Sequence, residues 1–392
     1  MSRPALADQP TDAPGTGRHL DRVRSALAWH LSKRDGRLLE WLRVDRIQPR
    51  PYSTVVFLTA RVDGQPMRLV SKTIAHHPDT RHVVEQENQA VVEYEMLSRL
   101  HTAFEHVEGC SVPRPLIVLP ELETCVMEHV DGQPLADRLR YARRFSAKDE
   151  LAMLADQFML CGRWLAHFQH TSATHLADDC AAAALVERCR HLLDKIPNAT
   201  GFGMSRAMRD RIMCDLGEQL DLLRGLRVPM TPHHSDFGPW NILALPGHVA
   251  VLDVLGCGQA PAPLDPIKML LYLEAERHCL TSSARRVDRL AREFLRGFGR
   301  LPGAGRPLAV ICESLYRISA LAHPQCLVGR RRLHHRLECR LVLRSHSNWL
   351  AGGPKRRMLW PDSETAGQGQ STSQNQQCHP RASTNALNQR IQ

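Results

Sequence analysis

The sequence predicts an α+β protein in which a small, strand-rich N-terminal lobe precedes a larger, mainly helical C-terminal lobe. Residues 55–74 predict a β-hairpin, because the segments VVFLTARV and MRLVSKTI flank the turn signal Asp63-Gly64. Farther along, apolar side chains recur at three- and four-residue steps from Leu151 to Phe168, which is the period of an α-helix. We therefore expect the N-terminal lobe at residues 19–130 and the C-terminal lobe at residues 131–350.

Each lobe has further predicted elements. A second strand pair, PLIVLP and TCVMEHV, brackets the turn-like segment 121–123 and follows a predicted helix. The C-terminal lobe is expected to contain a strand-rich segment at 241–255 and helices around residues 205–225, 266–298 and 306–348.

The two ends of the chain lack these periods. The first 18 residues are rich in Pro, Asp, Thr and Gly, and they predict a disordered leader. Residues 351–392 are polar and of low complexity, and they predict a disordered tail.

Composition narrows the class of protein. The formal net charge of +10 fits an anionic partner, such as a nucleotide, a phosphorylated sugar, a nucleic acid or a membrane surface. The 12 cysteines form no C-x-x-C pair and follow no secretory signal, which indicates reduced thiols in a cytoplasmic protein. No apolar run approaches the roughly 18 residues that a membrane span requires, so no such span is expected.

The segment HHSDFGPWNIL carries the strongest chemical signal. Asp236 precedes Asn241, which opens a predicted hairpin with a turn at Pro246-Gly247 and a second strand that ends at Asp253. Asn241 and Asp253 are equidistant from Gly247, so they should face each other within one register step. Their oxygens suit Mg²⁺, and Asp236 would accept a proton from an attacking hydroxyl. The alternative is that all three residues only cap turns and strand ends.

Two charged residues in the N-terminal lobe are predicted to face apolar layers. Lys72 shares one face of its strand with Val70 and Ile74, and Glu93 lies on the apolar stripe of the following helix. A buried ammonium and a buried carboxylate each need a partner, so we expect them to pair. The alternative is that both side chains reach water.

Together these residues resemble the aminoglycoside phosphotransferase and choline kinase-like family of small-molecule kinases, which are relatives of protein kinases. The resemblance covers about residues 50–300, and its most specific part is HSDFGPWNIL followed by VLDV. It implies a two-lobed, protein-kinase-like fold, with ATP and Mg²⁺ as the bound cofactors. In this family the equivalent Asp is catalytic, a His braces its loop, and a Lys–Glu pair anchors the nucleotide.

Carried to this sequence, the resemblance implies a role for each matching residue. The backbone near Glu128 and Val130 would bind adenine as the hinge. Asp265 matches the Asp that begins the helix after the metal-binding strand in such kinases, and we interpret it as a structural N-cap, not a catalytic residue. The remaining implied roles are Asp236 as the catalytic base, His234 as its brace, Asn241 and Asp253 as Mg²⁺ ligands, and Lys72 with Glu93 as the nucleotide anchor.

The sequence departs from the kinase pattern in two places. No glycine-rich loop precedes Lys72, so phosphate contacts would come from the backbone and from Ser53 or Thr54. Asp253 is followed by Val-Leu-Gly, and no A-P-E element follows, which favours small-molecule acceptors over proteins.

We therefore expect phosphoryl transfer from ATP to a hydroxyl of a sugar, polyol or aminoglycoside-like molecule. If the basic runs at residues 285–300 or 329–340 border the cleft, a neutral or anionic acceptor is favoured. The alternative is a catalytically weak kinase-fold protein that binds nucleic acid or another polyanion through these helices. Nucleic acid is disfavoured, because only 5% of the residues are aromatic and none interleaves with the basic runs.

Overall fold

The structure is a computed structural model, and it describes residues 16–50, 52–74, 88–141, 148–171, 175–196, 204–254, 258–279, 282–299, 305–323 and 333–352. Helix α1 (Thr16–His30) begins inside the segment predicted as a leader, so the last residues of that segment are helical. The rest of the predicted leader, and the predicted tail from residue 353 onward, lie outside the described residues.

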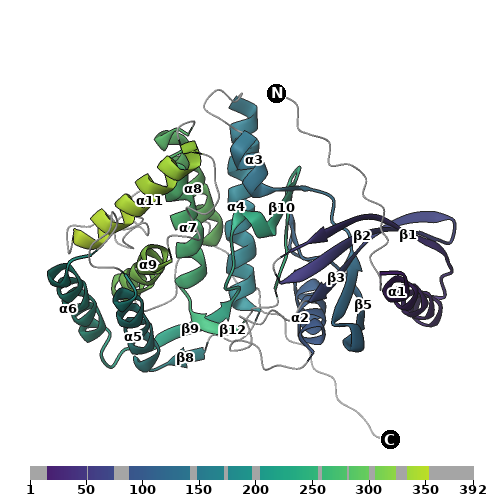
Figure 1. Ribbon diagram of the computed structural model, residues 1–392, viewed down its shortest axis with the longest axis horizontal. Coiled ribbons are helices and arrows are strands. Elements are labelled where there is room, and N and C mark those ends of the chain that lie inside the picture. Colours follow the sequence, from purple (N-terminus) through teal and green to yellow (C-terminus); the bar gives the residue numbers. More distant parts are fainter. Residues whose placement is uncertain are drawn as a thin grey trace, which may run out of the picture. The chain divides into compact units, whose positions relative to one another are not determined.

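The N-terminal part is built on a five-stranded antiparallel sheet with the strand order β1-β2-β3-β6-β5 (Figure 1). The predicted hairpin is confirmed, and Asp63 and Gly64 both have the positive φ that a tight two-residue turn requires. The second predicted pair is confirmed as β5 and β6, joined by the short 3₁₀ helix η3 (Pro120–Leu122). The five strands are β1 (Leu39–Pro49), β2 (Ser53–Val62), β3 (Gln65–Ile74), β5 (Pro115–Leu119) and β6 (Thr124–Glu128).

Two elements join this sheet that the sequence analysis does not predict. Strand β1 pairs with β2, and helix α1, extended by the π-helical turn η1 (Leu31–Asp35), packs on one face of the sheet. Leu27 of α1 is fully buried in one apolar cluster with Leu58 and Leu69. Because side chains alternate along a strand, Lys72 lies on the opposite face of the sheet, together with Val55.

The second predicted hairpin is also confirmed, as β10 (Ile242–Leu245) and β11 (His248–Val251). These strands belong to a small sheet with the order β4-β11-β10-β7. Its outer strands come from the first half of the chain, and they are β4 (Cys110–Ser111) and β7 (Gln133–Pro134). The hairpin is therefore held by backbone hydrogen bonds to segments more than a hundred residues earlier.

The C-terminal part is mainly helical, as expected. The long helix α4 (Lys148–His170) crosses α8 (Ala284–Phe298) closely. A Cβ atom at Gly162 or Gly297 would overlap the main chain of the other helix, so the crossing depends on these two glycines. A three-stranded sheet β12-β9-β8 lies among the helices, with β8 (His175–Ala177), β9 (Val228–His233) and β12 (Gly258–Pro261). The helices are α3 (Leu135–Tyr141), α4 (Lys148–His170), α5 (Cys180–Asp194), α6 (Arg206–Leu222), α7 (Leu264–Glu276), α8 (Ala284–Phe298), α9 (Gly305–Ala322) and α11 (Leu333–Ala351).

One apolar cluster connects the two parts of the chain. It contains buried residues of α2 (Gln89–Phe104), of α4, of the β10–β11 hairpin and of α8. At its centre the rings of Trp164, Phe168 and Phe237 stack at centroid distances of 5.1 and 5.7 Å. Phe237 belongs to the predicted catalytic segment, so this core fixes the position of that segment. Among the described residues, no helix has the length and apolar character needed to cross a membrane.

Candidate active site

The predicted catalytic segment is a loop between β9 and the β10–β11 hairpin. Asn241 ends the 3₁₀ helix η4 (Pro239–Asn241), immediately before β10. Its backbone oxygen accepts a hydrogen bond from Leu252 N at 2.8 Å, so Asn241 lies opposite Leu252. Asp253 is one position farther, within the register step that the sequence predicts, and its φ of 62° turns the chain at this point.

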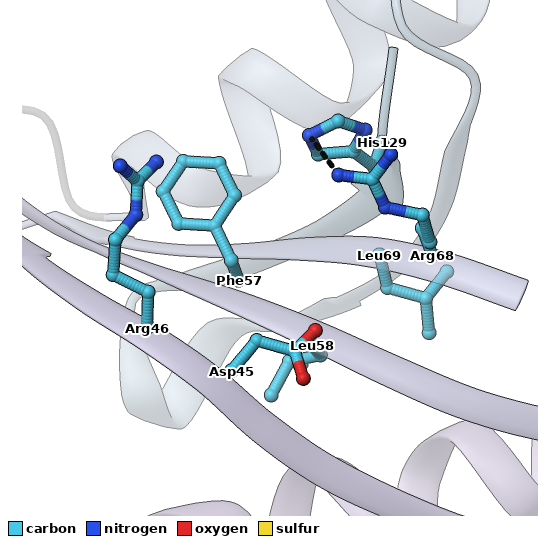
Figure 2. A pocket seen from close by; sticks show the side chains of 7 residues that line it. All are labelled: Asp45, Arg46, Phe57, Leu58, Arg68, Leu69 and His129. Atoms are coloured by element: carbon cyan, nitrogen blue, oxygen red, sulfur yellow. Dashed lines mark hydrogen bonds between the residues drawn. The ribbon is translucent and has the colours of Figure 1, made fainter. Parts of the chain in front are cut away.

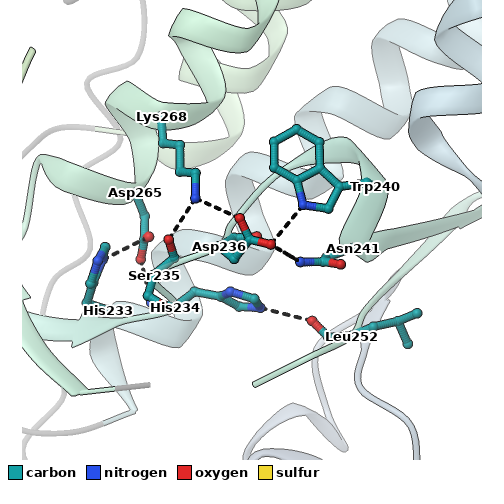
Figure 3. A network of polar contacts seen from close by, with 9 residues as sticks. All are labelled: His233, His234, Ser235, Asp236, Trp240, Asn241, Leu252, Asp265 and Lys268. Carbon is teal, nitrogen blue, oxygen red and sulfur yellow. Dashed lines mark hydrogen bonds and ion pairs between the residues drawn. The ribbon is translucent and has the colours of Figure 1, made fainter. Parts of the chain in front are cut away.

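The Asp236 carboxylate is the centre of a polar network (Figure 3). Lys268 Nζ donates to Oδ1 at 2.7 Å, and Oδ2 accepts from Trp240 Nε1 at 2.9 Å and from Asn241 Nδ2 at 2.8 Å. The Asn241 amide also donates to the Asp236 main-chain oxygen at 3.0 Å. These donors orient the carboxylate and leave it about half exposed, with 47% of its side chain accessible.

His234 packs in the apolar core beneath this loop and makes no hydrogen bond to the Asp236 carboxylate. Its ring is buried among Trp164, Phe168 and Phe237, and Nε2 donates to the Leu252 carbonyl at 3.1 Å. Burial lowers the pKa of His234, which keeps the ring neutral. The side chain thereby ties the loop to the end of β11.

The interpretation of Asp265 as an N-cap is wrong. Helix α7 begins at Leu264, and its N-cap position is Pro263. The fully buried Asp265 carboxylate instead accepts a hydrogen bond from His234 N at 2.7 Å and lies 2.9 Å from His233 Nδ1. A buried carboxylate needs donors, and here the main chain of the predicted catalytic loop supplies one in place of the helix's own backbone.

Lys72 joins the N-terminal sheet to the hairpin. Its Nζ lies 2.7 Å from Glu93 Oε1 and 2.8 Å from Asp253 Oδ1. The predicted Lys72–Glu93 pair is thus present, and Glu93 lies on the buried stripe of α2 with Ala90 and Leu97. The Lys72 side chain is 14% exposed and that of Glu93 is 2% exposed, so neither reaches freely into water.

The charges of these three groups depend on one another. Burial alone would lower the pKa of Lys72, but the Glu93 and Asp253 carboxylates raise it above its usual value. Burial raises the pKa of Glu93, against the opposing effect of the Lys72 ammonium. Burial would also raise the pKa of Asp253, but the neighbouring positive groups, Lys72 foremost, together hold the pKa below its usual value. Asp253 therefore stays ionised at neutral pH.

The residues predicted to contact the nucleotide lie in or directly beside the N-terminal sheet. Glu128 ends β6, where its amide donates to Arg114 O at 2.9 Å, and Val130 follows outside the strand. Ser53 opens β2 and pairs with Ile74, so it lies on the same face as Lys72. The structure thus places Ser53 on the Lys72 face of the sheet, whereas Glu128 pairs with Leu69 and points its side chain to the opposite face, so only its backbone remains a candidate for adenine contact.

A cavity of about 320 Å³ adjoins the predicted hinge (Figure 2). Arg46 lies over the Phe57 ring at 4.0 Å from its centroid, and Arg68 Nη2 lies 3.3 Å from His129 Nε2. Phe57 pairs with Val70, so it shares the sheet face of Lys72. The lining residues are Asp45, Arg46, Phe57, Leu58, Arg68, Leu69 and His129.

Sequence reasoning missed three residues of the site, namely Lys268, Trp240 and Tyr272. Trp240 stands within the motif, but no role follows from its position alone. Lys268 and Tyr272 lie three and seven residues after Asp265, so the helical period places all three on one side of α7. This helical period could have indicated that Lys268 and Tyr272 lie on the same side of α7 as Asp265. It does not identify Asp236 as the partner of Lys268.

Known structures share this fold. No protein-family model matches the sequence, and no curated protein matches it either. A glucosamine kinase, solved in complex with glucosamine, ADP and inorganic phosphate, is 18% identical and has a TM-score of 0.54, with 83% of this chain and 85% of that chain covered. An amicoumacin kinase, solved in complex with AMP-PNP, Ca²⁺ and Ami, is 12% identical and has a TM-score of 0.51, with 89% of this chain and 96% of that chain covered. The chain therefore has the predicted α+β, two-lobed, protein-kinase-like fold of small-molecule kinases.

Proposed function

We propose that the protein transfers the γ-phosphate of ATP to a hydroxyl group of a small molecule. The observation that carries this proposal is the position of Lys72, which bonds both Glu93 and Asp253 and thereby joins a nucleotide-binding sheet to the hairpin beside Asp236. In this proposal, Asp236 is the general base and His234 holds its loop. The shared fold of the glucosamine and amicoumacin kinases supports the same class of reaction.

The residues at the hairpin fit a magnesium ion. The Asn241 amide nitrogen donates both of its hydrogen bonds to Asp236, so the amide oxygen is the atom left for a cation. Asp253 uses Oδ1 for Lys72, which leaves Oδ2 for the same purpose. Two protein oxygens are a suitable set for Mg²⁺, which takes further ligands from water and from nucleotide phosphates.

The nucleotide would lie along the Lys72 face of the sheet. We assign its adenine to the backbone near Glu128 and Val130, beside the Phe57 cavity, and its phosphates to Lys72 and Ser53. When bound, Mg²⁺ would offset the negative charge of the phosphate oxygens.

The proposed reaction is an in-line displacement. The acceptor oxygen forms a bond to the γ-phosphorus while the bond from that phosphorus to the β,γ-bridging oxygen breaks, and ADP leaves. The proton of the acceptor hydroxyl passes to Asp236. Three donors hold the Asp236 carboxylate in place for this step, which keeps it in one orientation.

Purified protein tests this proposal in two stages. The first compares its melting temperature with ATP alone and with ATP plus Mg²⁺, and we expect a magnesium-dependent rise. The second measures ADP formation with a panel of hydroxylated metabolites. Asp236→Ala should reduce turnover by about 10²–10⁴-fold and leave the magnesium-dependent rise intact.

Asp221→Ala is the matched control, because this exposed aspartate lies at the end of α6. It should turn over like the wild type. Retained turnover in the Asp236 variant would remove the proposed base.

One observation favours the second candidate function, which is polyanion binding. Four exposed arginines of α8 follow one another at spacings of four, three and four residues, so they form a ridge on one side of the helix. The aromatic residues of α8, Phe294 and Phe298, are buried and cannot stack on bases. The ridge consists of Arg285, Arg289, Arg292 and Arg296.

Salt dependence separates the two functions. A polyanion binder should bind double-stranded DNA or heparin with an affinity that falls steeply as salt increases, and should lose it in Arg289→Glu/Arg292→Glu. Such binding without a magnesium-dependent effect of ATP would favour the second function.

A further inference from the structure

An exposed aromatic ring lies beside the Asp236 carboxylate. Trp240 is 42% exposed, although its Nε1 is bonded to Asp236 at 2.9 Å. Its ring packs edge to face with that of Tyr272 of α7, at a centroid distance of 5.5 Å. A large apolar surface at this position is held in place and remains accessible to a ligand.

Gly238 provides the space for this ring. A Cβ atom at Gly238 would lie 2.5 Å from Trp240 Cζ2, which is closer than side chains pack. Gly238 has an extended backbone, with φ near −158°, so its conformation does not require glycine. The close approach of the Trp240 indole is what requires glycine at this position. The loop sequence Gly-Pro-Trp is therefore arranged to place this ring against the main chain beside Asp236.

The Lys268 ammonium places a positive charge beside both the Asp236 carboxylate and the Trp240 ring. Its Nζ donates to Asp236 Oδ1 and to Ser235 O, both at 2.7 Å, and lies 6.0 Å from the centroid of the Trp240 ring (Figure 3). An exposed aromatic ring otherwise attracts cationic ligands such as quaternary amines. Here a cationic acceptor would meet the Lys268 ammonium next to the reacting carboxylate, and like charges repel.

The hydrogen bonds of Asp236 indicate where the acceptor hydroxyl binds. A carboxylate offers about two acceptor positions on each oxygen. Trp240 and Asn241 occupy both positions on Oδ2, and Lys268 occupies one on Oδ1. The remaining position is on Oδ1, next to Lys268. The acceptor hydroxyl and the Trp240 indole thus bind the same carboxylate.

This shared carboxylate limits where the acceptor can carry its reacting hydroxyl. A group that stacks on Trp240 must carry the reacting hydroxyl on the stacked ring itself, because both contacts lie at Asp236. A nucleoside that stacked through its base would hold its ribose hydroxyls farther away. A sugar ring fits, since its C–H face is apolar and its edge carries hydroxyls.

We propose that Trp240 binds the face of an uncharged polyhydroxylated ring, such as a hexose, and that Lys268 contacts its reacting hydroxyl and excludes cationic acceptors. This inference rests on the proposed phosphotransferase function and narrows its substrate class. Trp240 is then a specificity-determining residue.

The test uses the full-length protein and initial rates of ADP formation with Mg-ATP. The acceptors are glucose, mannose, galactose and myo-inositol, compared with glucosamine, kanamycin, choline and adenosine. We expect turnover with one or more uncharged rings and a kcat/KM at least about tenfold lower for every cation. A preference for a cation or for adenosine would overturn the inference and leave the phosphotransferase function standing.

Variants separate stacking from structural support. Trp240→Ala should raise the KM for the sugar at least about tenfold. Trp240→Phe should bring the KM most of the way back to the wild-type value, because the phenyl ring still stacks. Lys268→Met should raise the kcat/KM of glucosamine relative to glucose. The Mg-ATP melting shift, which should not change in either Trp240 variant, reports on folding. Trp29→Ala, at an exposed tryptophan of α1, is the matched control.

The failures are distinguishable. An unchanged sugar KM in Trp240→Ala, or a Trp240→Phe variant that behaves like Trp240→Ala, would contradict stacking. A magnesium-dependent ATP shift with neither turnover nor calorimetric binding of any sugar would overturn this inference alone. No ATP shift and no turnover with any acceptor would instead refute the proposed function.

Discussion

Two lysines pair with the two carboxylates of the proposed site, and they differ in their second partner. Lys72 pairs with Asp253 and also with the buried Glu93. Lys268 pairs with Asp236, and its second acceptor is the Ser235 carbonyl. With Glu93 and Asp253 both ionised, the three groups around Lys72 sum to a charge of −1, whereas the Lys268 ammonium and the Asp236 carboxylate sum to zero.

This difference divides the site into two sides. The side of Asp253 keeps one net negative charge, which favours a metal cation. The side of Asp236 is neutral before the acceptor enters, which suits an uncharged molecule. The predictions that follow perturb one side at a time.

The largest effect on stability is expected at Lys72. Lys72→Met leaves the Glu93 carboxylate buried without its cation, and breaking a buried ion pair costs about 3–5 kcal/mol. Urea unfolding measures this loss. The double variant Lys72→Met/Glu93→Leu should recover much of the stability without recovering Mg-ATP binding. Lys195→Met, at an exposed lysine after α5, is the control. A loss below about 1 kcal/mol would show that the pair is effectively solvated.

An intermediate effect is expected at Gly238. In Gly238→Ala the new methyl group displaces the Trp240 ring, so the acceptor side is disturbed and the metal side is not. We expect kcat/KM for the acceptor to fall about tenfold or more, which corresponds to about 1.4 kcal/mol, with an unchanged Mg-ATP affinity. Steady-state kinetics and calorimetry measure the two quantities. An equal loss in both would contradict the division into two sides.

A smaller effect on stability is expected at Lys268. Lys268→Met removes a cation from a carboxylate that is about half exposed and that keeps its bonds to Trp240 and Asn241. Exposed pairs contribute about 0–1 kcal/mol, so the free energy of unfolding should fall by less than about 1 kcal/mol. A loss as large as that of Lys72→Met would remove the contrast between the two lysines.

The smallest effect concerns acidic pH. The pKa of Asp253 is lower in the folded protein than its usual value of 3.8, because the neighbouring positive groups, Lys72 foremost, together outweigh burial. The folded state then binds fewer protons, so this stabilisation is present above about pH 4 and is lost as the pH falls through the folded pKa.

The stability difference between the wild type and Asp253→Asn measures this contribution. It should stay below about 1 kcal/mol, since the carboxylate is about half exposed, and should decrease below pH 4. In the Lys72→Met/Glu93→Leu background the pH dependence should disappear. A difference that grows as the pH falls would reverse the assigned sign.

The sequence predicted the Lys72 side better than the Lys268 side, for a physical reason. Lys72 and Glu93 each stand on a regular element with a clear apolar face, so local periodicity shows that both are buried and need partners. Lys268 stands on α7, but its partner lies 32 residues earlier in an irregular loop. No local pattern connects them. Asp265 was misassigned for the same reason, because its donors come from that loop rather than from its own helix.

The fold shows the same limit. The β2–β3 hairpin and helix α4 follow from their periods and turn residues. Strand β1 has intermediate and exposed side chains without simple alternation, so its pairing with β2 decides its structure. The register of the β10–β11 hairpin was predictable within one step. The contact between Asp253 and Lys72 depends on how the sheet packs against the hairpin.

Mg-dependent ATP binding by Asp253→Asn and Asp236→Asn, measured side by side by calorimetry, tests the central claim most directly. Both variants should lose phosphoryl transfer. Asp253→Asn should also lose most of the magnesium-dependent affinity, because it removes the net negative charge on the metal side, whereas Asp236→Asn should bind Mg-ATP like the wild type. Equal Mg-ATP affinity in the two variants, or loss of binding only in Asp236→Asn, would contradict the assignment of the two carboxylates.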